Sequence, residues 1–476
     1  MPITNPESTS LPAPELNEKE LRVLNKLQNV PGLVLAHGLG TGKTRTSLQV
    51  ANALGAPTNV VVPAALQENY RKELRKWLGS VPETFNIQSQ QRAASKGLTN
   101  PELATLIVDE AHRARDPQSK LLKALQQSEA NKKLLLTASP VYNHPADIAG
   151  LINLAAGKPI LPEDRTKFEQ EFVKEKPVKP PLWGGLVGLK PGLAKELVQD
   201  PRLKAAIRSY VDYQAGRAEG FPAFKEEEVP VGLSGSQQDI YNTILGKAPA
   251  WVRWKVQMGL PPGKSELQSL QAFLTGARQV SNSTYDFIAD KTKTESPKIQ
   301  KAFDYLKTEL EKNPRYKGVV YSNYLGSGLA PYKSLLEKHK IPYGEFSGDI
   351  SAKERDQMVR DYNANKLRAL LISSAGAEGL DLKGTRLLQI LEPHFNKEKE
   401  KQIVGRAIRY LSHAGLPENE QNVLIQRYLS QPKAGLLDRL LGNKKVKGTD
   451  EYISSLANEK EKLNEQLLAM LAKYGK

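Results

Sequence analysis

The chain contains no cysteine and only six histidines among its 476 residues. Without cysteine there is no disulfide, no cysteine-ligated metal cluster and no thiol nucleophile. The histidines are scattered and form no His-x-x-x-His pair, which argues against a histidine metal site. No apolar run has the length of a membrane-spanning helix, and residues 1–21 lack the hydrophobic stretch of a signal peptide. These absences predict a protein of the reducing cytoplasm without a membrane partner.

Acidic residues are fewer than basic ones. The 68 Lys and Arg residues exceed the 52 Asp and Glu residues, which gives a formal charge of +16. Such a surplus favours a polyanionic partner but does not name one. The composition, 39% hydrophobic and 25% charged, is that of an ordinary globular chain, and the length predicts two or three domains.

Short apolar runs alternate with helical patterns in two separate regions. In the first region the runs are Leu33–Ala36, Val60–Val62, Leu106–Val108 and Leu134–Leu136; in the second they are Gly318–Tyr321, Leu370–Ile372, Leu387–Leu391 and Val423–Ile425. Continuously apolar strands separated by helices are typical of parallel sheets covered on both faces. The sequence therefore predicts an α/β protein with two parallel-sheet lobes.

The remaining segments set the predicted domain boundaries. They are a flexible lead-in (1–15), a first lobe (16–230) with an irregular Pro/Gly-rich insertion (158–192), a helical linker region (231–296), a second lobe (297–448) and a C-terminal amphipathic helix (449–476). Trp251 and Trp254 in the helical region are interpreted as packing residues, with base stacking as the alternative.

The strongest local signal is the glycine-rich segment His37–Thr44, which lies between a predicted strand and a predicted helix. Phosphate binding requires glycines for close backbone approach, a helix N-terminus, a lysine and a hydroxyl for Mg²⁺. The residues that meet these needs are Gly40, Thr41, Gly42, Lys43 and Thr44. A strict phosphate-loop pattern has glycine where His37 stands, and the alternative is a turn that binds nothing.

An acidic pair, Asp109 and Glu110, follows the strand Leu106–Val108. Carboxylates at the carboxyl end of a buried parallel strand lie where such sheets bind ligands. Asp109 is predicted to hold Mg²⁺ together with Thr44, and Glu110 to orient or deprotonate an attacking water. The alternative is that the pair only caps the following helix.

Two further segments are less specific by themselves. Leu134–Pro140 contains Thr137 and Ser139 after a strand, which fits either a simple turn or a hydroxyl relay. In the second half, Gln402–Arg409 is predicted to place Arg406 and Arg409 on one helical face. Two guanidinium groups there suit a triphosphate, and an exposed basic helix is the alternative. The loop Ser373–Asp381 precedes them and is rich in glycine.

Taken together and in this order, these motifs resemble those of superfamily 2 helicases and translocases with a DEAH box. The resemblance covers about Leu16–Ser430 and implies two RecA-like lobes with ATP in the cleft between them. It implies that His112, Gln402, Thr137 and Ser139 couple nucleotide state to lobe closure, that Arg406 and Arg409 are arginine fingers, and that Gly379 and Asp381 sense nucleotide and nucleic acid.

Several stretches are similar to the Swi/Snf-type branch, which translocates on double-stranded DNA. They are Thr137–Asn143, Gln237–Ile244, Ala277–Asn282 and Ser296–Ile299, whereas Ala407–Pro417 is more similar to virus- or phage-encoded relatives. The glutamine that reads adenine in this family is not found upstream of the phosphate loop, where the comparable segment is Leu16–Leu21. ATP as the nucleotide is therefore implied by the resemblance alone.

The leading functional prediction is an ATP- and Mg²⁺-dependent motor on nucleic acid, with duplex or branched DNA favoured over single strands and RNA. The excess Lys and Arg would contact phosphates without reading sequence. The alternative is a DNA-dependent ATPase that acts as a transcription or packaging switch without strand separation. The C-terminal helix is predicted to dock a protein partner or to pack on the second lobe. A metabolic phosphotransferase leaves the Arg406 and Arg409 pair unexplained.

Overall fold

The computed structural model describes residues 16–476 except 39, 142–143, 180–190, 217–219, 264–265, 347–349, 375–379, 396, 410 and 435–446. The chain forms two compact units. The first comprises the chain up to Lys174, Leu197–Arg217 and Leu463–Lys476, and the second comprises Glu175–Glu196 and Ala218–Lys462. The predicted lead-in 1–15 lies outside the described residues.

The first unit is built on a six-stranded parallel sheet. Its strands are β1 (Gly32–His37), β2 (Thr58–Val62), β3 (Phe85–Ser89), β4 (Thr105–Val108), β5 (Lys132–Thr137) and β8 (Val211–Gln214), in the order β3-β2-β4-β5-β1-β8. Strands β1, β2 and β4 are buried along their whole length. Burial on both faces explains why their sequences are continuously apolar.

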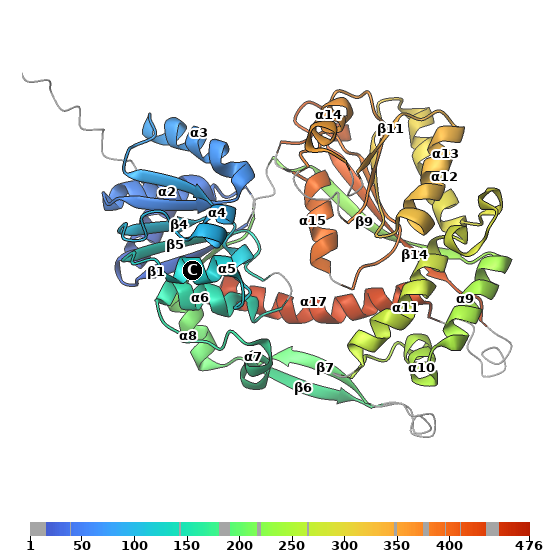
Figure 1. Cartoon of the computed structure of the whole chain (residues 1–476), viewed down its shortest axis with the longest axis horizontal. Coiled ribbons are helices and arrows are strands. Elements are labelled where there is room, and N and C mark those ends of the chain that lie inside the picture. Colours follow the sequence, from blue (N-terminus) through green and yellow to red (C-terminus); the bar gives the residue numbers. More distant parts are fainter. Residues whose placement is uncertain are drawn as a thin grey trace, which may run out of the picture. The chain divides into compact units, whose positions relative to one another are not determined.

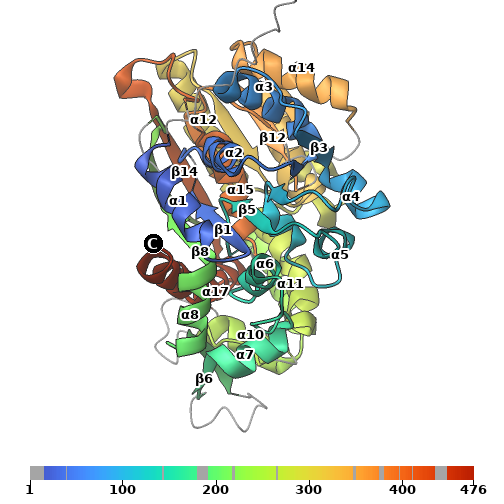
Figure 2. The ribbon, with the colours of Figure 1, turned by 90° about the vertical axis from the view of Figure 1, so that its left-hand side faces the viewer.

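Helices cover both faces of this first sheet (Figure 1). One apolar cluster joins α1 (Glu18–Gln28), α2 (Lys43–Leu54) and α3 (Gln67–Leu78) to the sheet. The other joins α4 (Gln90–Lys96), α5 (Lys120–Gln126), α6 (Asp147–Ala156), α7 (Arg165–Phe172) and α8 (Pro201–Tyr210). Alternate residues of β1 belong to the two clusters. Leu33 and Leu35 pack in the cluster with α1–α3, and Val34 and Ala36 pack in the cluster with α4–α8. Helix α1 lies beside α2 (Figure 2).

The segment 158–192 is more regular than its composition predicts. It contains α7 and β6 (Val173–Val178), and β6 forms a two-stranded sheet with β7 (Gly192–Leu197). Strand β6 tolerates Pro177 because a two-stranded sheet consists only of edge strands. The prediction of an irregular insertion is therefore wrong for the described part of this segment.

The second unit has its own six-stranded parallel sheet, in the order β11-β12-β10-β13-β14-β9. Its strands are β9 (Ala223–Gly232), β10 (Gly318–Tyr321), β11 (Tyr343–Phe346), β12 (Ala369–Ile372), β13 (Leu387–Ile390) and β14 (Asn422–Gln431). Strand β9 pairs with β14, from Ala223 opposite Asn422 to Gly232 opposite Gln431. The predicted boundary at residue 230 had assigned β9 to the first lobe, and this assignment is wrong.

Helices also cover both faces of the second sheet. Helices α14 (Ala352–Asn363) and α15 (Lys397–Ala407) contribute to one apolar cluster, and α12 (Pro297–Lys312) and α13 (Ala330–Lys338) to the other. Two all-parallel sheets with helices on both faces confirm the predicted α/β fold of two RecA-like lobes.

The predicted helical region contains α9 (Gly235–Lys247), α10 (Ala250–Met258) and α11 (Leu267–Asn282). Trp251 packs against the apolar cluster of these helices. The C-terminal helix α17 (Thr449–Tyr474) adds Tyr452, Ile453 and Leu456 to the same cluster, and its later residues Leu463, Leu467, Met470 and Leu471 belong to the core of the first unit. None of the helices in the described parts of the chain is long and apolar enough to cross a membrane.

Candidate nucleotide site

The glycine-rich segment lies between β1 and α2, at the carboxyl edge of the first sheet. Gly40 and Gly42 have φ angles of +72° and +73°, a region that disfavours residues with a side chain. A Cβ atom on Gly38 would come within 2.3 Å of the backbone nitrogen of Gly216, so this position also requires glycine. The loop is closed by the Thr41 hydroxyl, which donates to the Gly38 carbonyl at 2.8 Å. Residue 39 lies outside the described residues.

Lys43 is the first residue of α2, with Thr44 directly after it. The Lys43 ammonium group donates to the Gly38 carbonyl at 3.3 Å, which holds the side chain along the loop. Burial lowers the pKa of Lys43, and the nearby carboxylates of Glu110 and Asp109 oppose that shift. A partly buried ammonium group at a helix N-terminus favours anion binding, because the backbone N–H groups of the first helical turn lack partners within the helix.

Asp109 and Glu110 follow β4, the strand that lies between β2 and β5. The Asp109 carboxylate accepts a hydrogen bond from the Glu110 backbone N–H at 2.9 Å, and the Gln90 amide donates to the Asp109 carbonyl at 2.6 Å. Burial, with a further contribution from the Glu110 charge, raises the pKa of Asp109 to about 6. Glu110 has a φ of +49°, a strained conformation for a non-glycine residue. The left-handed Glu110 directly precedes a short helical turn, Ala111–Ala114.

The donor set at this edge fits magnesium better than a metal held by protein alone. No cluster of three or more His, Cys, Asp or Glu side chains with metal-binding geometry occurs in the described part of the chain. Mg²⁺ usually takes one or two protein oxygens and completes its shell with water and substrate phosphates. The Thr44 hydroxyl and the Asp109 carboxylate are the protein oxygens that would hold it, and the ion would favour the ionised form of Asp109.

The structure brings the predicted coupling residues of the first unit together. The Nδ1 atom of His112 lies 3.3 Å from a carboxylate oxygen of Glu110 and 3.2 Å from the Thr137 hydroxyl. The Thr137 hydroxyl accepts the backbone N–H of Ser139 at 3.0 Å. Burial lowers the pKa of His112. A contact path therefore runs from the carboxylate pair to the loop after β5.

The predicted residues of the second unit are arranged differently from the expectation. Gln402 and Arg406 lie on α15, but this helix ends at Ala407, so Arg409 lies outside it. The prediction that both arginines share a helical face is wrong, since the chain leaves the helix between them. Arg409 instead forms an ion pair with Asp381 at 3.0 Å and donates to the Leu380 carbonyl at 3.1 Å. Gly379 lies outside the described residues.

The carboxyl edge of the second sheet also carries a buried polar cluster that the sequence analysis missed. The Lys298 ammonium group contacts Asp450 at 2.6 Å and Asn282 at 2.9 Å, and Asn282 donates to Glu392 at 2.6 Å. Glu392 also accepts the Ser322 hydroxyl at 2.9 Å, and burial raises its pKa. These partners come from distant segments, so no local pattern predicts them. Lys298, Asn282, Glu392 and Asp450 are each at most 1% exposed.

His37, the departure from the glycine pattern, has a structural explanation. Its Nε2 atom lies 2.6 Å from the Asp212 carboxylate, which also accepts two hydrogen bonds from Arg22 at 2.9 and 3.0 Å. Burial lowers the pKa of His37. This cluster links α1, β1 and β8 directly before the phosphate loop. The only feature of the sequence that pointed to this cluster was the histidine at a position where the pattern has glycine.

Helix α1 also contacts the loop and the start of α2. The Lys19 ammonium group donates to the Thr41 carbonyl, and Glu20 forms an ion pair with Arg45 at 3.1 Å. The Arg45 guanidinium group lies 4.4 Å from the centre of the Trp77 ring. These contacts fix helix α1 against the phosphate loop and the start of α2.

Comparison with known proteins agrees with this geometry. Residues 81–286 match the family model of the SNF2-related domain, and residues 301–411 match that of the helicase conserved C-terminal domain. Over these two segments the chain is similar to the SNF2-related superfamily 2 helicases. The SNF2-related match includes the carboxylate pair, and the helicase C-terminal match includes Arg406 and Arg409. The protein is thus a nucleic-acid-dependent ATPase of the ATP-driven motor class, as the motifs predict.

Several of the proteins that this chain resembles are viral. It is 29% identical over 462 residues to "Putative ATP-dependent RNA helicase L538" of Acanthamoeba polyphaga mimivirus, covering 94% of both chains. It is 23% identical over 546 residues to "Termination factor NPH-I homolog" of African swine fever virus, covering 92% of this chain and 75% of that one. The predicted likeness to viral proteins is confirmed.

A solved structure supports the fold of this chain. The Hef helicase domain of Pyrococcus furiosus superposes with a TM-score of 0.50 at 14% identity, and the match covers 90% of this chain and 97% of that chain.

Proposed function

We propose that the protein is an ATP-driven motor that translocates along double-stranded or branched DNA. The observation that carries this proposal is the shared edge of the first sheet, where Lys43 and the Asp109 and Glu110 carboxylates lie within electrostatic reach of one another. Lys43 suits the phosphates, Asp109 suits Mg²⁺ and Glu110 suits the attacking water.

The proposed roles follow from the chemistry of each group. Lys43 and the backbone N–H groups of the loop bind the phosphates, Thr44 and Asp109 hold Mg²⁺, and Glu110 orients the water. When bound, Mg²⁺ neutralises charge on the phosphates. His112, Thr137 and Ser139 transmit the state of the Glu110 carboxylate along the hydrogen bonds described above. Arg406 and Arg409 supply positive charge to the transferring phosphoryl group, and Gln402 assists them.

For Arg409 this role requires a change of partner. Its guanidinium group is engaged by Asp381 and the Leu380 carbonyl, so it must exchange the Asp381 carboxylate for a phosphate to act as a finger. Gly379 and Asp381 would then respond to the nucleotide through this exchange. This gives the loop before Arg409 a direct chemical link to the nucleotide.

DNA as the substrate is supported by the SNF2-related match, since the branch is characterised by duplex translocation. The mimivirus relative is named as an RNA helicase, which favours RNA as a second candidate. The name of the African swine fever virus relative favours a switch in transcription termination that needs no strand separation. We also propose that the protein is located in the cytoplasm. The excess Lys and Arg residues are proposed to contact nucleic-acid phosphates.

A series of ATPase measurements separates these functions. Phosphate release is measured with no polymer and with duplex DNA, single-stranded DNA, forked DNA and RNA. We expect duplex or forked DNA to stimulate turnover most, and added salt to reduce that stimulation steeply. Stimulation by RNA alone would replace DNA as the substrate, and equal rates with every polymer would overturn the motor. A strand-displacement assay on the forked DNA then distinguishes a helicase from a translocase.

A further inference from the structure

Strand β9 is an edge strand of unusual length. It pairs over ten residues with β14 and stands at the end of the second sheet. The other edge strands of the two large sheets, β3, β8 and β11, have five, four and four residues. A long edge strand presents a row of backbone donors and acceptors to which another strand can pair.

The direction of these backbone groups follows from two hydrogen bonds. The N–H group of Ala223 donates to the carbonyl of Gln421, the residue before β14, at 3.0 Å, and that of Leu233 donates to the carbonyl of Gln431, the last residue of β14, at 3.2 Å. In a strand, alternate residues direct their N–H and C=O groups to opposite sides. The even-numbered residues Phe224, Glu226, Glu228 and Pro230 therefore direct theirs away from the sheet. In agreement, the Lys301 ammonium group reaches the Pro230 carbonyl at 3.5 Å from that side.

The outward backbone groups of β9 are partly protected against pairing with another strand. Pro230 has no N–H to offer, and the charged run Glu226–Glu228 opposes pairing with a second acidic strand. Nevertheless, no strand among the described residues pairs with the side of β9 to which Phe224, Glu226 and Glu228 direct their N–H groups. Phe224 is 57% exposed, so this end of the strand is open to solvent. The edge thus rejects acidic strands but leaves three donors for another kind.

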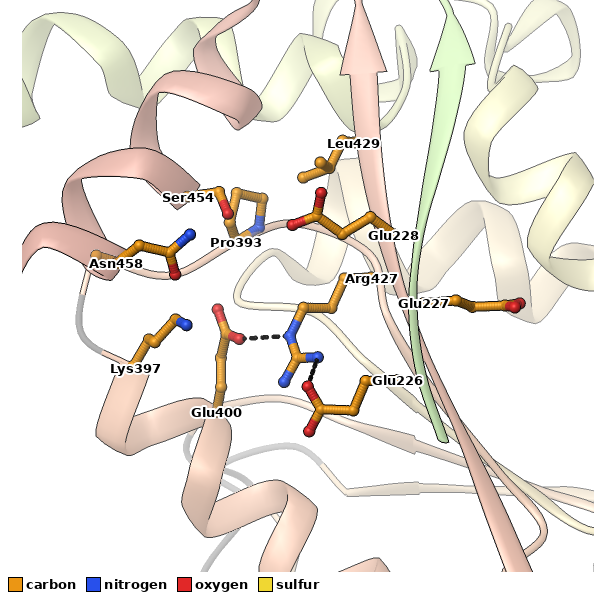
Figure 3. Close-up of a pocket in the computed structure, with 11 residues that line it drawn as sticks. Glu226, Glu227, Glu228, Pro393, Lys397, Glu400, Arg427, Leu429, Ser454 and Asn458 are labelled. Atoms are coloured by element: carbon orange, nitrogen blue, oxygen red, sulfur yellow. Dashed lines mark hydrogen bonds and ion pairs between the residues drawn. The ribbon is translucent and has the colours of Figure 1, made fainter. Parts of the chain in front are cut away.

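A pocket of about 160 Å³ lies beside the same strand (Figure 3). At its centre Arg427 donates to Glu400 at 3.1 Å and to Glu226 at 2.7 Å, so its charge is already balanced by two carboxylates. Glu228 also lines the pocket and has no ion-pair partner among the described side chains. Glu227 points to the opposite side of the strand, where Gln426 donates to it at 2.8 Å.

The charges around the pocket define what it accepts. Its charged lining consists of Glu226, Glu228 and Glu400 against Arg427 and Lys397, with Ser454 and Asn458 as neutral polar groups. With Glu227, which also borders the pocket but points to the other side of the strand, the acidic residues exceed the basic ones by two, on a chain whose formal charge is +16. A nucleic-acid phosphate is repelled here, whereas the ammonium or guanidinium group of a lysine or arginine is attracted.

We propose that β9 is the docking edge for an extended, basic segment of a protein partner. The segment adds as a strand beside β9, and its backbone pairs with the outward groups of Phe224, Glu226 and Glu228. Added strands place alternate side chains on the two faces of the sheet, so a lysine or arginine next to Glu228 lies over the pocket. Backbone pairing supplies affinity, and the pocket selects the basic side chain. This surface goes beyond the motor activity and does not depend on it.

A peptide of alternating threonine and lysine tests the proposal with the full-length protein. Binding of the fluorescently labelled peptide is followed by anisotropy in the absence of DNA. We expect saturable binding, and none by the same peptide with glutamate in place of lysine. A peptide N-methylated at alternate backbone amides keeps its charge but loses its pairing groups. Equal binding of the N-methylated peptide would overturn the strand addition.

Variants of the strand locate the binding. Glu228→Lys is expected to weaken peptide binding about tenfold, the change that ~1.4 kcal/mol produces. The matched control is Glu311→Lys, the same charge change on α12, which should leave binding unchanged. Phe224→Pro removes an outward N–H without breaking the ladder to β14, while Phe224→Ala keeps it; only the proline variant should bind more weakly. Equal binding of the peptide by Glu228→Lys and wild type would show that the pocket does not select the basic side chain.

Polymer-stimulated ATP hydrolysis is the control for folding. It should be the same in wild type, Glu228→Lys and Phe224→Pro, because these residues lie outside the nucleotide site. A second copy of the chain is a poor occupant, since it would bring its own Glu226–Glu228 run against this one. Sedimentation of the protein alone tests that case, and a dimer abolished by Phe224→Pro would contradict the partner proposed here.

Discussion

The two sheets have the same architecture, but the charged groups at their carboxyl edges have different partners. In the first unit, Lys43, Asp109 and Glu110 stand at that edge, and Asp109 has a pKa raised to about 6 because burial disfavours its charge. In the second unit, Lys298, Asp450 and Glu392 are also buried, but Lys298 pairs with Asp450 and Asn282 links it to Glu392. At the first edge the charged groups would be balanced by a ligand, whereas at the second edge each charged group already has buried polar partners within the protein.

This difference teaches which edge is built for a ligand. Ligands of parallel α/β sheets bind at the carboxyl ends of the strands, so both edges were candidates by topology alone. Glu392 cannot accept a ligand without losing its bonds to Asn282 and Ser322. The first edge loses little when phosphate and Mg²⁺ arrive, because they supply the missing charge partners.

Removing the cation of the first edge should have the broadest effect, because nucleotide binding and turnover are both lost. Lys43→Ala is expected to lower saturated ATP turnover by about 10²–10³-fold, because the phosphates lose a preorganised positive charge. Phosphate release with saturating polymer measures it. Lys72→Ala, which removes an exposed lysine on α3, should stay near wild type. Near-normal turnover of Lys43→Ala would show that the first edge is not the nucleotide site.

Glu110→Gln sharpens the same result by separating binding from turnover. The amide retains the size of the side chain but cannot accept a proton, so turnover should fall by about 10²–10⁴-fold. Binding of a fluorescent ATP analogue should remain, unlike in Lys43→Ala. An active Glu110→Gln enzyme would remove Glu110 from its role toward the water.

The internally balanced edge of the second unit should respond in stability. Lys298→Met leaves the Asp450 charge buried without its partner and is expected to lower the free energy of unfolding of this unit by about 3–5 kcal/mol. Adding Asp450→Asn should recover part of that loss, since both charges are then gone. Urea unfolding followed by hydrogen exchange in the second unit measures both. A surface control, Lys307→Met, should change stability by at most about 0.5 kcal/mol.

At the first edge, the stability of the folded chain should depend on pH through Asp109. Because the folded-state pKa of Asp109 is raised from 3.8 to about 6, the folded chain binds more protons than the unfolded chain between these values. Stability contributed by Asp109 therefore falls as pH rises through this window. Above it the ionised carboxylate costs up to about 3 kcal/mol in the absence of Mg²⁺.

Asp109→Asn removes this dependence. We expect the variant to match wild type near the lower end of the window and to be more stable above pH 6, with turnover lost because Mg²⁺ is held poorly. Unfolding free energies measured across the window without nucleotide provide the test. A difference between the two proteins that does not change with pH would mean that the Asp109 carboxyl is not perturbed.

The smallest effect is expected at the contacts leading away from the first edge. His112→Ala and Thr137→Val each break the contact between these two side chains and should reduce polymer stimulation by the equivalent of about 0.5–2 kcal/mol. Basal turnover without polymer should remain. The double variant should be no worse than either single one, because both remove the same contact; additive losses would show that the residues act separately.

The parts of the site that could be predicted lie on consecutive residues. Gly40–Thr44 and Asp109–Glu110 follow buried strands directly, so the strand pattern and a few neighbouring residues place them together. Arg409 shows the limit of such reasoning, since spacing predicts a helical face and the chain leaves the helix at Ala407. The Lys298–Asp450 contact joins residues 152 apart, and local patterns carry no information about it.

The sequence by itself determined the two lobes, the phosphate loop and the carboxylate pair, because buried parallel strands are recognisable as apolar runs and the chemistry sits at their ends. Only the tertiary structure decided that β9 joins the second sheet, that His37 pairs with Asp212 and that the second carboxyl edge is closed. The physical reason is the same in each case. Edge-strand pairing and buried charge pairs depend on partners brought together by folding, and a charged run such as Glu226–Glu228 looks like a loop until its neighbour β14 is known.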